Sequence, residues 1–338
     1  MENETAEARQ ARLGTGLEGL LAKEFGAQVE VSGIVETSAG ARRNNVLFDA
    51  RVGGAIGRYC ATIMPTPDIE LKPIPEEAAL IQLAEQAGVR VPHVHFASED
   101  ASWVGGPVFV SDCVEGETVP RRVLRSVAEH GSGSVLTADL GRALAALHGI
   151  EADVAPPSLS RPGTGSPAAL ALEHLAEQVD GLLQPGPVFQ LGLTWLRRNE
   201  PRAPARLTIV HGDVRNGNII VAPDGLAAVL DWELAKIGDP MEDLAWLCLR
   251  CWRFGEDAIE VGGFGARETL VDAYSTLGGS FDPVAFHWWK VLGTMRWGLG
   301  LAGQAAQHLS GAFSNIVMAA SGRRVAELEY DLLTLLEV

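Results

Sequence analysis

The stretch "VHGDVRNGNIIVAPDGLAAVLDWELA", residues 210–235, places two clusters of polar side chains between apolar runs. Short runs of β character surround the clusters: "LTIV" at 207–210, "NIIVA" at 218–222 and "LAAVLDW" at 226–232. A Pro-Asp-Gly turn joins the last two runs into a predicted hairpin. The polar side chains therefore fall where strands meet loops. We expect Asp213 and Asn218, on one connecting loop, to meet Asp231 at the end of the hairpin strand.

These three side chains suit one kind of chemistry. Mg²⁺ prefers carboxylate and amide oxygens and normally binds one or two protein carboxylates together with phosphate oxygens, which matches Asn218 and Asp231. Asp213 is then left to orient a substrate hydroxyl and to accept its proton as the hydroxyl attacks a terminal phosphoryl group. The stretch therefore predicts a phosphoryl-transfer centre.

The same residues carry a resemblance to a known family. "HGDVRNGN", followed by "LDWE" and then "GDPMEDLAWL", closely resembles the aminoglycoside phosphotransferase family, whose signature is H-G-D-x-x-x-x-N followed by an aspartate in place of the protein-kinase D-F-G. "LCLRCWRFGED" and the tryptophan-rich tail are similar to a subgroup of phosphotransferases, some of which are fused to acyl-CoA dehydrogenase domains. The resemblance extends over nearly the whole chain. It implies an α+β, bilobal protein-kinase-like fold, with a small antiparallel-sheet N-lobe, a mainly helical C-lobe and ATP in the cleft.

The chain divides accordingly. Residues 1–113 are expected to form the N-terminal lobe, with a glycine-rich hairpin, a helix that carries Glu77 and the interlobe hinge. Residues 114–338 are expected to form the helical lobe, with the catalytic loop and the substrate region. Helical patterns predict helices near 239–254, 268–277, 282–309 and from 322 to the end. The Asp282-Pro283 pair is a helix start signal, and the helix after it, apolar nearly all round, should be the buried axis of this lobe.

The resemblance also implies a role for each matching position. Asp213 becomes the catalytic base, Asn218 and Asp231 become the magnesium ligands, and His211 and Asp243 support the catalytic loop. The implied cofactors are ATP and Mg²⁺, and the implied partner is a small molecule with a hydroxyl group. The implied nucleotide contacts are Gly40, Arg42 and Arg43 in the hairpin, Glu77 on the helix, and Asp112, Cys113 and Val114 at the hinge.

One departure from the family pattern concerns the phosphate-binding cation. Relatives usually carry Lys or Arg on the third strand, where this chain has Thr62 or Ile63 in "GRYCATIMPTP". Arg58 on the same strand lies roughly 13 Å away, near the limit of a long side chain's reach. Arg42 and Arg43 are therefore the better candidates. The alternative function is a pseudokinase, which binds nucleotide with little or no turnover.

Charge and hydropathy exclude other classes of partner. The net charge of −16 repels nucleic acid and anionic membranes, which need Lys and Arg to bind them. The acidic, polar first residues do not form a signal peptide, and no apolar run reaches membrane-spanning length, so we expect a cytoplasmic protein. The acidic balance would tolerate a cationic aminoglycoside. Members of the family also act on sugars, amino alcohols and macrolides, which leaves the acceptor open.

Four other patterns favour structural roles. "GTGLEG" at 14–19 matches a dinucleotide-binding motif but follows a helix-like segment instead of the strand that this motif requires. Cys248 and Cys251 fall in a predicted helix without a second C-x-x-C, so packing is favoured over zinc binding. His93 and His95 share a strand face but lack an evident third metal ligand. Most of the tryptophans are expected in the core, with one or two at the substrate pocket: Trp246, Trp252, Trp288, Trp289 and Trp297.

Overall fold

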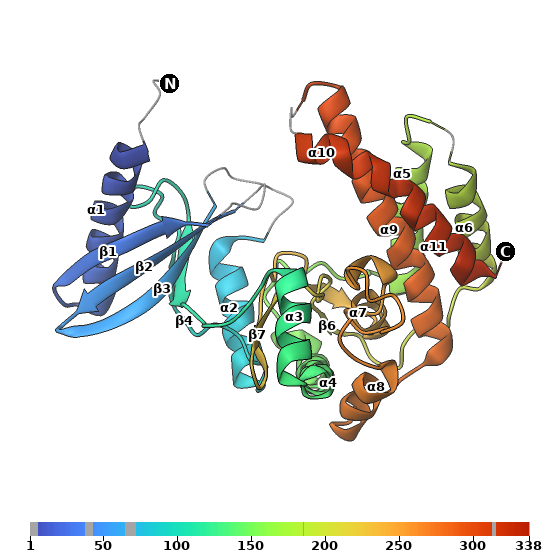
Figure 1. The fold of residues 1–338 in the computed structure, drawn as a ribbon, viewed down its shortest axis with the longest axis horizontal. Coiled ribbons are helices and arrows are strands. Elements are labelled where there is room, and N and C mark those ends of the chain that lie inside the picture. Colours follow the sequence, from blue (N-terminus) through green and yellow to red (C-terminus); the bar gives the residue numbers. More distant parts are fainter. Residues whose placement is uncertain (1–5, 38–42, 65–71, 185, 313–315, 338) are drawn as a thin grey trace.

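The computed structural model describes residues 6–37, 43–64, 72–184, 186–312 and 316–337, and the statements below concern these residues. A five-stranded antiparallel sheet with two helices forms the N-terminal part, and helices dominate the rest (Figure 1). The α+β kinase-like fold class is therefore confirmed. The N-terminal elements are α1 (Ala6–Phe25), β1 (Val29–Glu36), β2 (Asn44–Val52), β3 (Ala55–Ile63), α2 (Ile74–Gln86), β4 (Val94–Ser98) and β5 (Val108–Asp112).

The sheet has the strand order β1-β2-β3-β5-β4. On β2, the side chains of Val46, Phe48 and Ala50 are buried in alternation with less buried neighbours, as expected for a strand with one face on a core. Leu17 and Leu20 of α1 belong to the same buried cluster. Helix α1 therefore covers one face of the sheet.

The glycine motif at 14–19 lies inside α1. A Cβ atom on Gly16 would lie 1.9 Å from the carbonyl oxygen of Trp103, and one on Gly19 would lie 2.5 Å from the Trp103 ring. These glycines therefore allow the loop that carries Trp103 to approach the helix closely. The motif packs a helix and forms no phosphate-binding loop, in agreement with the sequence.

The remaining elements are helices with four short strands between α6 and α7, which form two antiparallel pairs, β6 with β9 and β7 with β8. In chain order they are α3 (Pro120–His130), α4 (Gly133–Gly149), α5 (Pro167–Asp180), α6 (Pro187–Arg198), β6 (Thr208–Val210), β7 (Ile219–Ala222), β8 (Gly225–Val229), β9 (Lys236–Gly238), α7 (Met241–Leu247), α8 (Arg267–Thr276), α9 (Pro283–Leu309), α10 (Ile316–Ser321) and α11 (Val325–Leu336).

Helix α9 is the long central helix of this part. Its N-cap, Asp282, accepts hydrogen bonds from the backbone N–H groups of Val284, at 2.8 Å, and Ala285, at 3.1 Å. The helix packs against α7, α10 and α11, and twelve of its residues are buried. The predicted start and burial of this helix are confirmed. Among the described helices none is long and apolar enough to cross a membrane.

The predicted helix at 239–254 is wrong in its second half. Helix α7 ends at Leu247, and a separate 3₁₀ turn covers Arg250–Trp252. Leu249 between them is extended, with φ −64° and ψ 144°, and the Arg253 guanidinium donates to the carbonyl of Cys248 at 3.0 Å. The Arg253 side chain thus provides a hydrogen bond to the Cys248 carbonyl at the helix end. The apolar periodicity of the sequence does not predict this contact.

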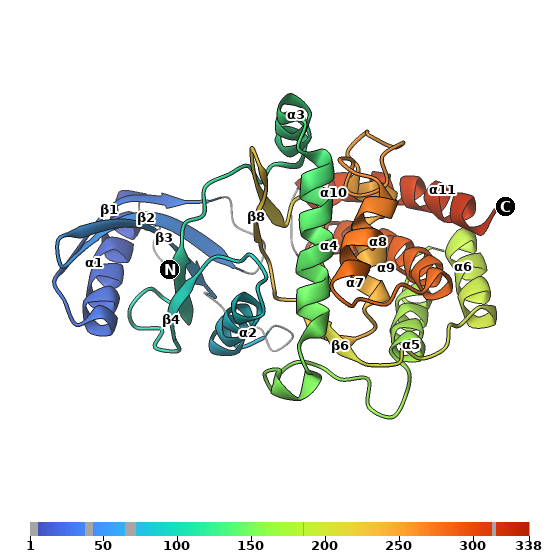
Figure 2. The same ribbon diagram turned by 90° about the horizontal axis from the view of Figure 1, so that it is seen from below.

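The β7–β8 hairpin joins the two parts of the molecule. The backbone N–H of Val229 donates to the carbonyl of Arg90 at 2.8 Å, and the Arg90 guanidinium donates to the carbonyl of Leu226 at 2.6 Å. Figure 2 shows β8 between the sheet and α4. The segment between β6 and β9 is therefore anchored at the border of the two lobes.

Candidate active site

A buried aspartate on α7 holds the backbone of the loop after β6. Asp243 is 0% exposed and accepts hydrogen bonds at 2.8 Å from the N–H groups of both His211 and Gly212. His148 lies 3.1 Å from the same carboxylate. Burial alone would raise the pKa of Asp243, but these contacts hold it below its ordinary value. The carboxylate therefore fixes the path of the loop.

The ring of His211 ties this loop to the end of β8. Its Nδ1 lies 3.2 Å from the backbone N–H of Asp213 and accepts from it, so Nε2 carries the proton and donates to the carbonyl of Leu230 at 3.0 Å. Burial lowers the pKa of His211, which favours this neutral form. His211 thus positions Asp213 and Asp231 relative to each other through the backbone.

The Asp213 carboxylate is fixed by three donors. Asn218 Nδ2 donates to Oδ2 at 2.6 Å. Trp246 Nε1 and Arg215 Nε donate to Oδ1, at 2.8 Å and 3.1 Å. Asn218 Nδ2 also donates to the backbone carbonyl of Asp213. Both described hydrogen bonds of this side chain therefore use Nδ2, and Oδ1 accepts none among the described contacts. An amide oxygen without a partner suits a hard cation.

Asp231 adopts a left-handed backbone conformation, with φ 65°, that non-glycine residues rarely adopt. Its side chain lines a cavity. Removal from bulk water, with the nearby carboxylates of Glu233 and Asp213, raises the pKa of Asp231 to about 6. Crowded carboxylates of this kind repel one another, and a divalent cation would relieve the repulsion. Asn218 and Asp231 therefore fit Mg²⁺.

A cavity of about 2010 Å³ is lined by both Asn218 and Asp231 and reaches the predicted hinge, Asp112, Cys113 and Val114. The N–H of Asp112 donates to the carbonyl of His93 at 2.9 Å, and that of Cys113 donates to the carbonyl of Arg58 at 3.0 Å. Among the described contacts, the N–H of Val114 has no acceptor. Val114 is therefore the hinge residue with a backbone donor available to an adenine edge.

The cation expected on the third strand is found beside the neighbouring strand. The register pairs Asn44 of β2 with Ile63 of β3, so Arg43 comes directly before the residue opposite the expected position. Arg43 is 7% exposed, and its Nη2 lies 2.5 Å from the Glu77 carboxylate. Its Nε lies 3.3 Å from Glu233, and its Nη1 has no described hydrogen-bond partner. Arg43 also lines the larger cavity, so this orphaned donor fits a phosphate oxygen.

The other predicted cations are placed differently. Arg58 is exposed and lies 3.9 Å from Asp49, on the outer part of the sheet. Gly40 and Arg42 lie outside the described residues.

One cation was missed by the sequence. Lys72, just before α2, is 8% exposed and donates to the carbonyl of Glu233 at 2.8 Å. Burial lowers the pKa of Lys72 to about 8. No local motif marks this lysine, because its environment comes from a segment far along the chain.

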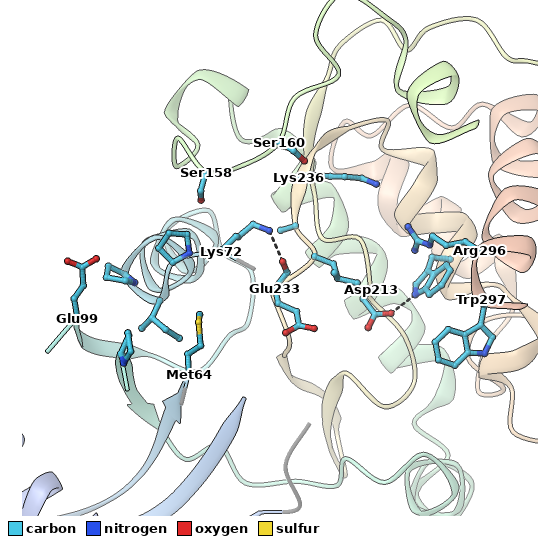
Figure 3. Close-up of a pocket in the computed structure, with 17 residues that line it drawn as sticks. Met64, Lys72, Glu99, Ser158, Ser160, Asp213, Glu233, Lys236, Arg296 and Trp297 are labelled. Atoms are coloured by element: carbon cyan, nitrogen blue, oxygen red, sulfur yellow. Dashed lines mark hydrogen bonds between the residues drawn. The ribbon is translucent and has the colours of Figure 1, made fainter. Parts of the chain in front are cut away.

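A second cavity, of about 870 Å³, adjoins the larger one and shares Glu233, Leu234 and Arg296 with it. Figure 3 shows Asp213 at this cavity with Lys72, Glu233, Lys236, Arg296 and Trp297. Asp213 lines the smaller cavity, whereas Asn218 and Asp231 line the larger one. The catalytic loop therefore presents its carboxylate to one space and its metal-binding candidates to the other.

The remaining sequence candidates have structural partners. His93 lies 3.0 Å from Glu85, and His95 lies 2.7 Å from Asp112. Within the described ranges, no three His, Cys, Asp or Glu side chains form a metal-binding group. Trp252, Trp288 and Trp289 are buried. Trp246 and Trp297 line the smaller cavity.

Comparison with known proteins adds family information. The model of the "Phosphotransferase enzyme family" (APH) matches residues 34–279. Acyl-CoA dehydrogenase family member 10 of Mus musculus is 29% identical over 182 residues, which are 52% of this chain and 16% of that protein. The matched segments span only 16% to 22% of the length of the first curated relatives.

Solved structures share the fold over nearly the whole chain. The GDP complex of aminoglycoside 2'-phosphotransferase-IIIa has a TM-score of 0.67 and 11% identity, over 94% of this chain and 99% of that one. A thermostable mutant of aminoglycoside phosphotransferase APH(4)-Ia, in ternary complex with ADP and hygromycin B, has a TM-score of 0.58 and 16% identity, over 94% and 98% of the two chains. At these identities the likeness establishes the fold alone.

Proposed function

This chain belongs to the phosphotransferase enzyme family, and on that premise we propose that it transfers the γ-phosphoryl group of ATP to a hydroxyl group of a small molecule. The observation that carries the proposal is the placement of the catalytic loop. Asp213 borders the smaller cavity, and Asn218 and Asp231 border the larger one. A donor nucleotide in the larger cavity and an acceptor hydroxyl in the smaller one would therefore meet at this loop.

Each residue then has a defined role. Val114 offers its backbone N–H to the adenine edge, and Arg43 offers Nη1 to a phosphate oxygen. Asn218 Oδ1 and the Asp231 carboxylate would hold Mg²⁺, which neutralises charge on the phosphates when bound. Asp213 accepts the proton of the acceptor hydroxyl while that oxygen forms a bond to the γ-phosphorus and the bond to the leaving ADP breaks.

The geometry around Asp213 supports the assignment of the base. Its carboxylate is oriented by Trp246, Arg215 and Asn218, so it does not need to reorganise when the acceptor arrives. The structural relatives in complex with GDP, or with ADP and hygromycin B, are consistent with a nucleotide and a small acceptor on this fold. These ligands are properties of those proteins, and they support the proposal by analogy.

The alternative, a pseudokinase, rests on the missing third-strand cation. The Arg43–Glu77 pair provides a cation at the neighbouring position and so favours turnover. A melting scan with Mg²⁺-ATP, followed by an ADP-release assay with a panel of hydroxyl compounds, separates the two functions. We expect stabilisation by Mg²⁺-ATP and acceptor-dependent ADP release. Stabilisation without release for any acceptor would make the pseudokinase the correct assignment.

A further inference from the structure

The smaller cavity has a wall of positive charge. Lys72 lies before α2, Lys236 begins β9 and Arg296 lies on α9, and all three side chains line this cavity (Figure 3). Three separate segments thus bring cations to one space beside Asp213. This convergence occurs in a chain whose net charge is −16, so it does not follow from the composition.

The cations of this wall are only partly neutralised. Lys236 Nζ and Arg296 Nη1 both lie 2.8 Å from the same Oε1 atom of Glu242, which is 4% exposed. Lys72 donates to the backbone carbonyl of Glu233 and forms no ion pair among the described contacts. One buried carboxylate is therefore shared by two positive side chains, Lys236 and Arg296.

The other acids at the cavity have different partners. The Glu233 carboxylate lies 3.3 Å from Arg43, and Asp213 is paired with Arg215 at 3.1 Å. Glu99 is exposed. The carboxylates of Glu77 and Glu233 partly offset the charge of Lys72. Lys236 and Arg296 share the single carboxylate of Glu242, so a positive charge remains at that part of the wall.

Some hydrogen-bond donors on this wall also have no described acceptor. Lys72 and Lys236 each have three ammonium N–H donors and one described hydrogen-bond acceptor. Lys72 is 8% exposed, so water compensates its remaining donors poorly. An anionic ligand would satisfy these donors and the surplus charge together. Trp297 on the same cavity provides an apolar surface for a carbon skeleton.

We propose that the smaller cavity is the acceptor site and that it takes a hydroxyl compound bearing an anionic group, a carboxylate or a phosphate, bound by Lys72, Lys236 and Arg296. This inference rests on the proposed phosphotransferase function. The hydroxyl group lies at Asp213, and the anionic group lies on the cationic wall. A polycationic acceptor such as an aminoglycoside would meet repulsion from the same three side chains.

Calorimetric titration of three compounds with one skeleton tests the charge preference: glycerol, glycerate and glycerol 3-phosphate, each added to the full chain with Mg²⁺ and a non-hydrolysable ATP analogue. We expect at least one of the two anions to bind about tenfold or more tightly than glycerol, and kanamycin to bind more weakly than that anion. The stronger of the two anions identifies carboxylate or phosphate. Equal affinity for glycerol and both anions, no binding of either anion, or tighter binding of kanamycin overturns the proposal.

Charge-neutralising variants locate the site. Lys236→Gln should weaken binding of the preferred anion about tenfold and leave glycerol binding unchanged, and Lys72→Gln should act in the same direction. Lys23→Gln, at an exposed position of α1 that does not line the cavity, removes the same charge and is the matched control. Parent-like affinity for the anion in folded Lys236→Gln and Lys72→Gln variants contradicts the proposal. Binding and transfer are measured separately, so the two proposals can fail separately. Anion binding without any ADP release would contradict only the transferase function. Transfer to glycerol in preference to both anions would contradict only the anionic acceptor.

Discussion

The catalytic loop and the Arg43 cluster (Arg43, Lys72, Glu77 and Glu233) flank the same cleft but are assembled differently. Asp213 and Asn218 are five positions apart and are joined by a 2.6 Å hydrogen bond. In the Arg43 cluster, Arg43 and Glu233 are 190 positions apart, and Lys72 and Glu233 are 161 apart. One region is a local turn, whereas the other joins three segments from both lobes, around Arg43, residues 72–77 and Glu233.

This difference predicts different responses to mutation. The catalytic loop is held by Asp243 and His211, which are not themselves the proposed reacting groups. Replacing a reacting side chain there should remove chemistry and leave the fold. In the Arg43 cluster, Arg43 contacts the carboxylates of Glu77 and Glu233, so replacing one member of these pairs leaves its partner without a counter-charge. Stability and nucleotide binding should therefore change together in that cluster.

The largest effect is expected at Asp231. Asp231→Ala should abolish phosphoryl transfer and remove the Mg²⁺-dependent part of the stabilisation by ATP, because one of two proposed metal ligands is lost. Melting scans with ATP, with and without Mg²⁺, measure this. Asp231→Asn is the control for backbone strain, because Asn tolerates the left-handed conformation better than Ala. Equal stabilisation of parent and both variants by Mg²⁺-ATP would remove Asp231 from the metal site.

Asp213→Asn should lower turnover by about two to four orders of magnitude, the range for loss of a positioned general base. Folding and Mg²⁺-ATP binding should stay close to those of the parent, since the loop is held by Asp243. Steady-state ADP release and calorimetric titration of ATP report the two properties. Near-native turnover would assign the base to another residue.

These two regions also show how far the sequence could predict the site. Spacing within 210–233 predicted the strands, the turn and the clustering of Asp213 and Asn218, because these depend on contacts between near neighbours. It missed Lys72, and it placed the Arg43 side chain in a hairpin cover where the structure buries it against Glu77. The position of Arg43 depends on β2–β3 register, and the burial of Lys72 depends on a carbonyl far along the chain.

The same limit applies to the fold. The capped and apolar helix α9 was readable because Asp282, Pro283 and the residues after them carry their own signals. The end of α7 could not be predicted. The carbonyl of Cys248 accepts a hydrogen bond from the Arg253 side chain, which reaches it only after the chain has turned back. Long periodic elements are thus predictable from sequence, and terminations that depend on a returning side chain are not.

A paired replacement sharpens the contrast at the Arg43 cluster. Arg43→Met with Glu77→Gln removes both charges of the buried pair, so Glu77 is not left as an unpaired buried carboxylate. Glu233, which also contacts Arg43, is 23% exposed and can be solvated. We expect ATP affinity to fall about tenfold because a phosphate-binding cation is lost. Arg43→Met alone should also destabilise the fold, and comparison of the two variants separates the effects. Unchanged ATP affinity in the folded double variant would show that Arg43 does not bind phosphate.

The pH dependence of stability tests Lys72. Its folded pKa, about 8, lies below the ordinary value of 10.5. The folded chain therefore binds fewer protons than the unfolded chain between these values, and stability rises with pH across that window. Lys72→Gln lacks this titration, so its stability relative to the parent should fall by on the order of 1 kcal/mol from pH 8 to pH 10. Denaturant unfolding at several pH values measures this, and a constant difference would refute it.

The smallest effect is expected at Arg58, which is exposed, whereas Arg43 beside the same sheet is buried. Arg58 is exposed, and its 3.9 Å contact with Asp49 is a surface ion pair of the kind that contributes about 0–1 kcal/mol. Its strand position is opposite Asp49, six positions along β2 from Arg43, so it points to a different part of the sheet. Arg58→Ala should therefore change ATP affinity by less than about twofold. A tenfold loss in the calorimetric titration would transfer the phosphate-binding role from Arg43 to Arg58, and the cation would then lie on the third strand as in relatives.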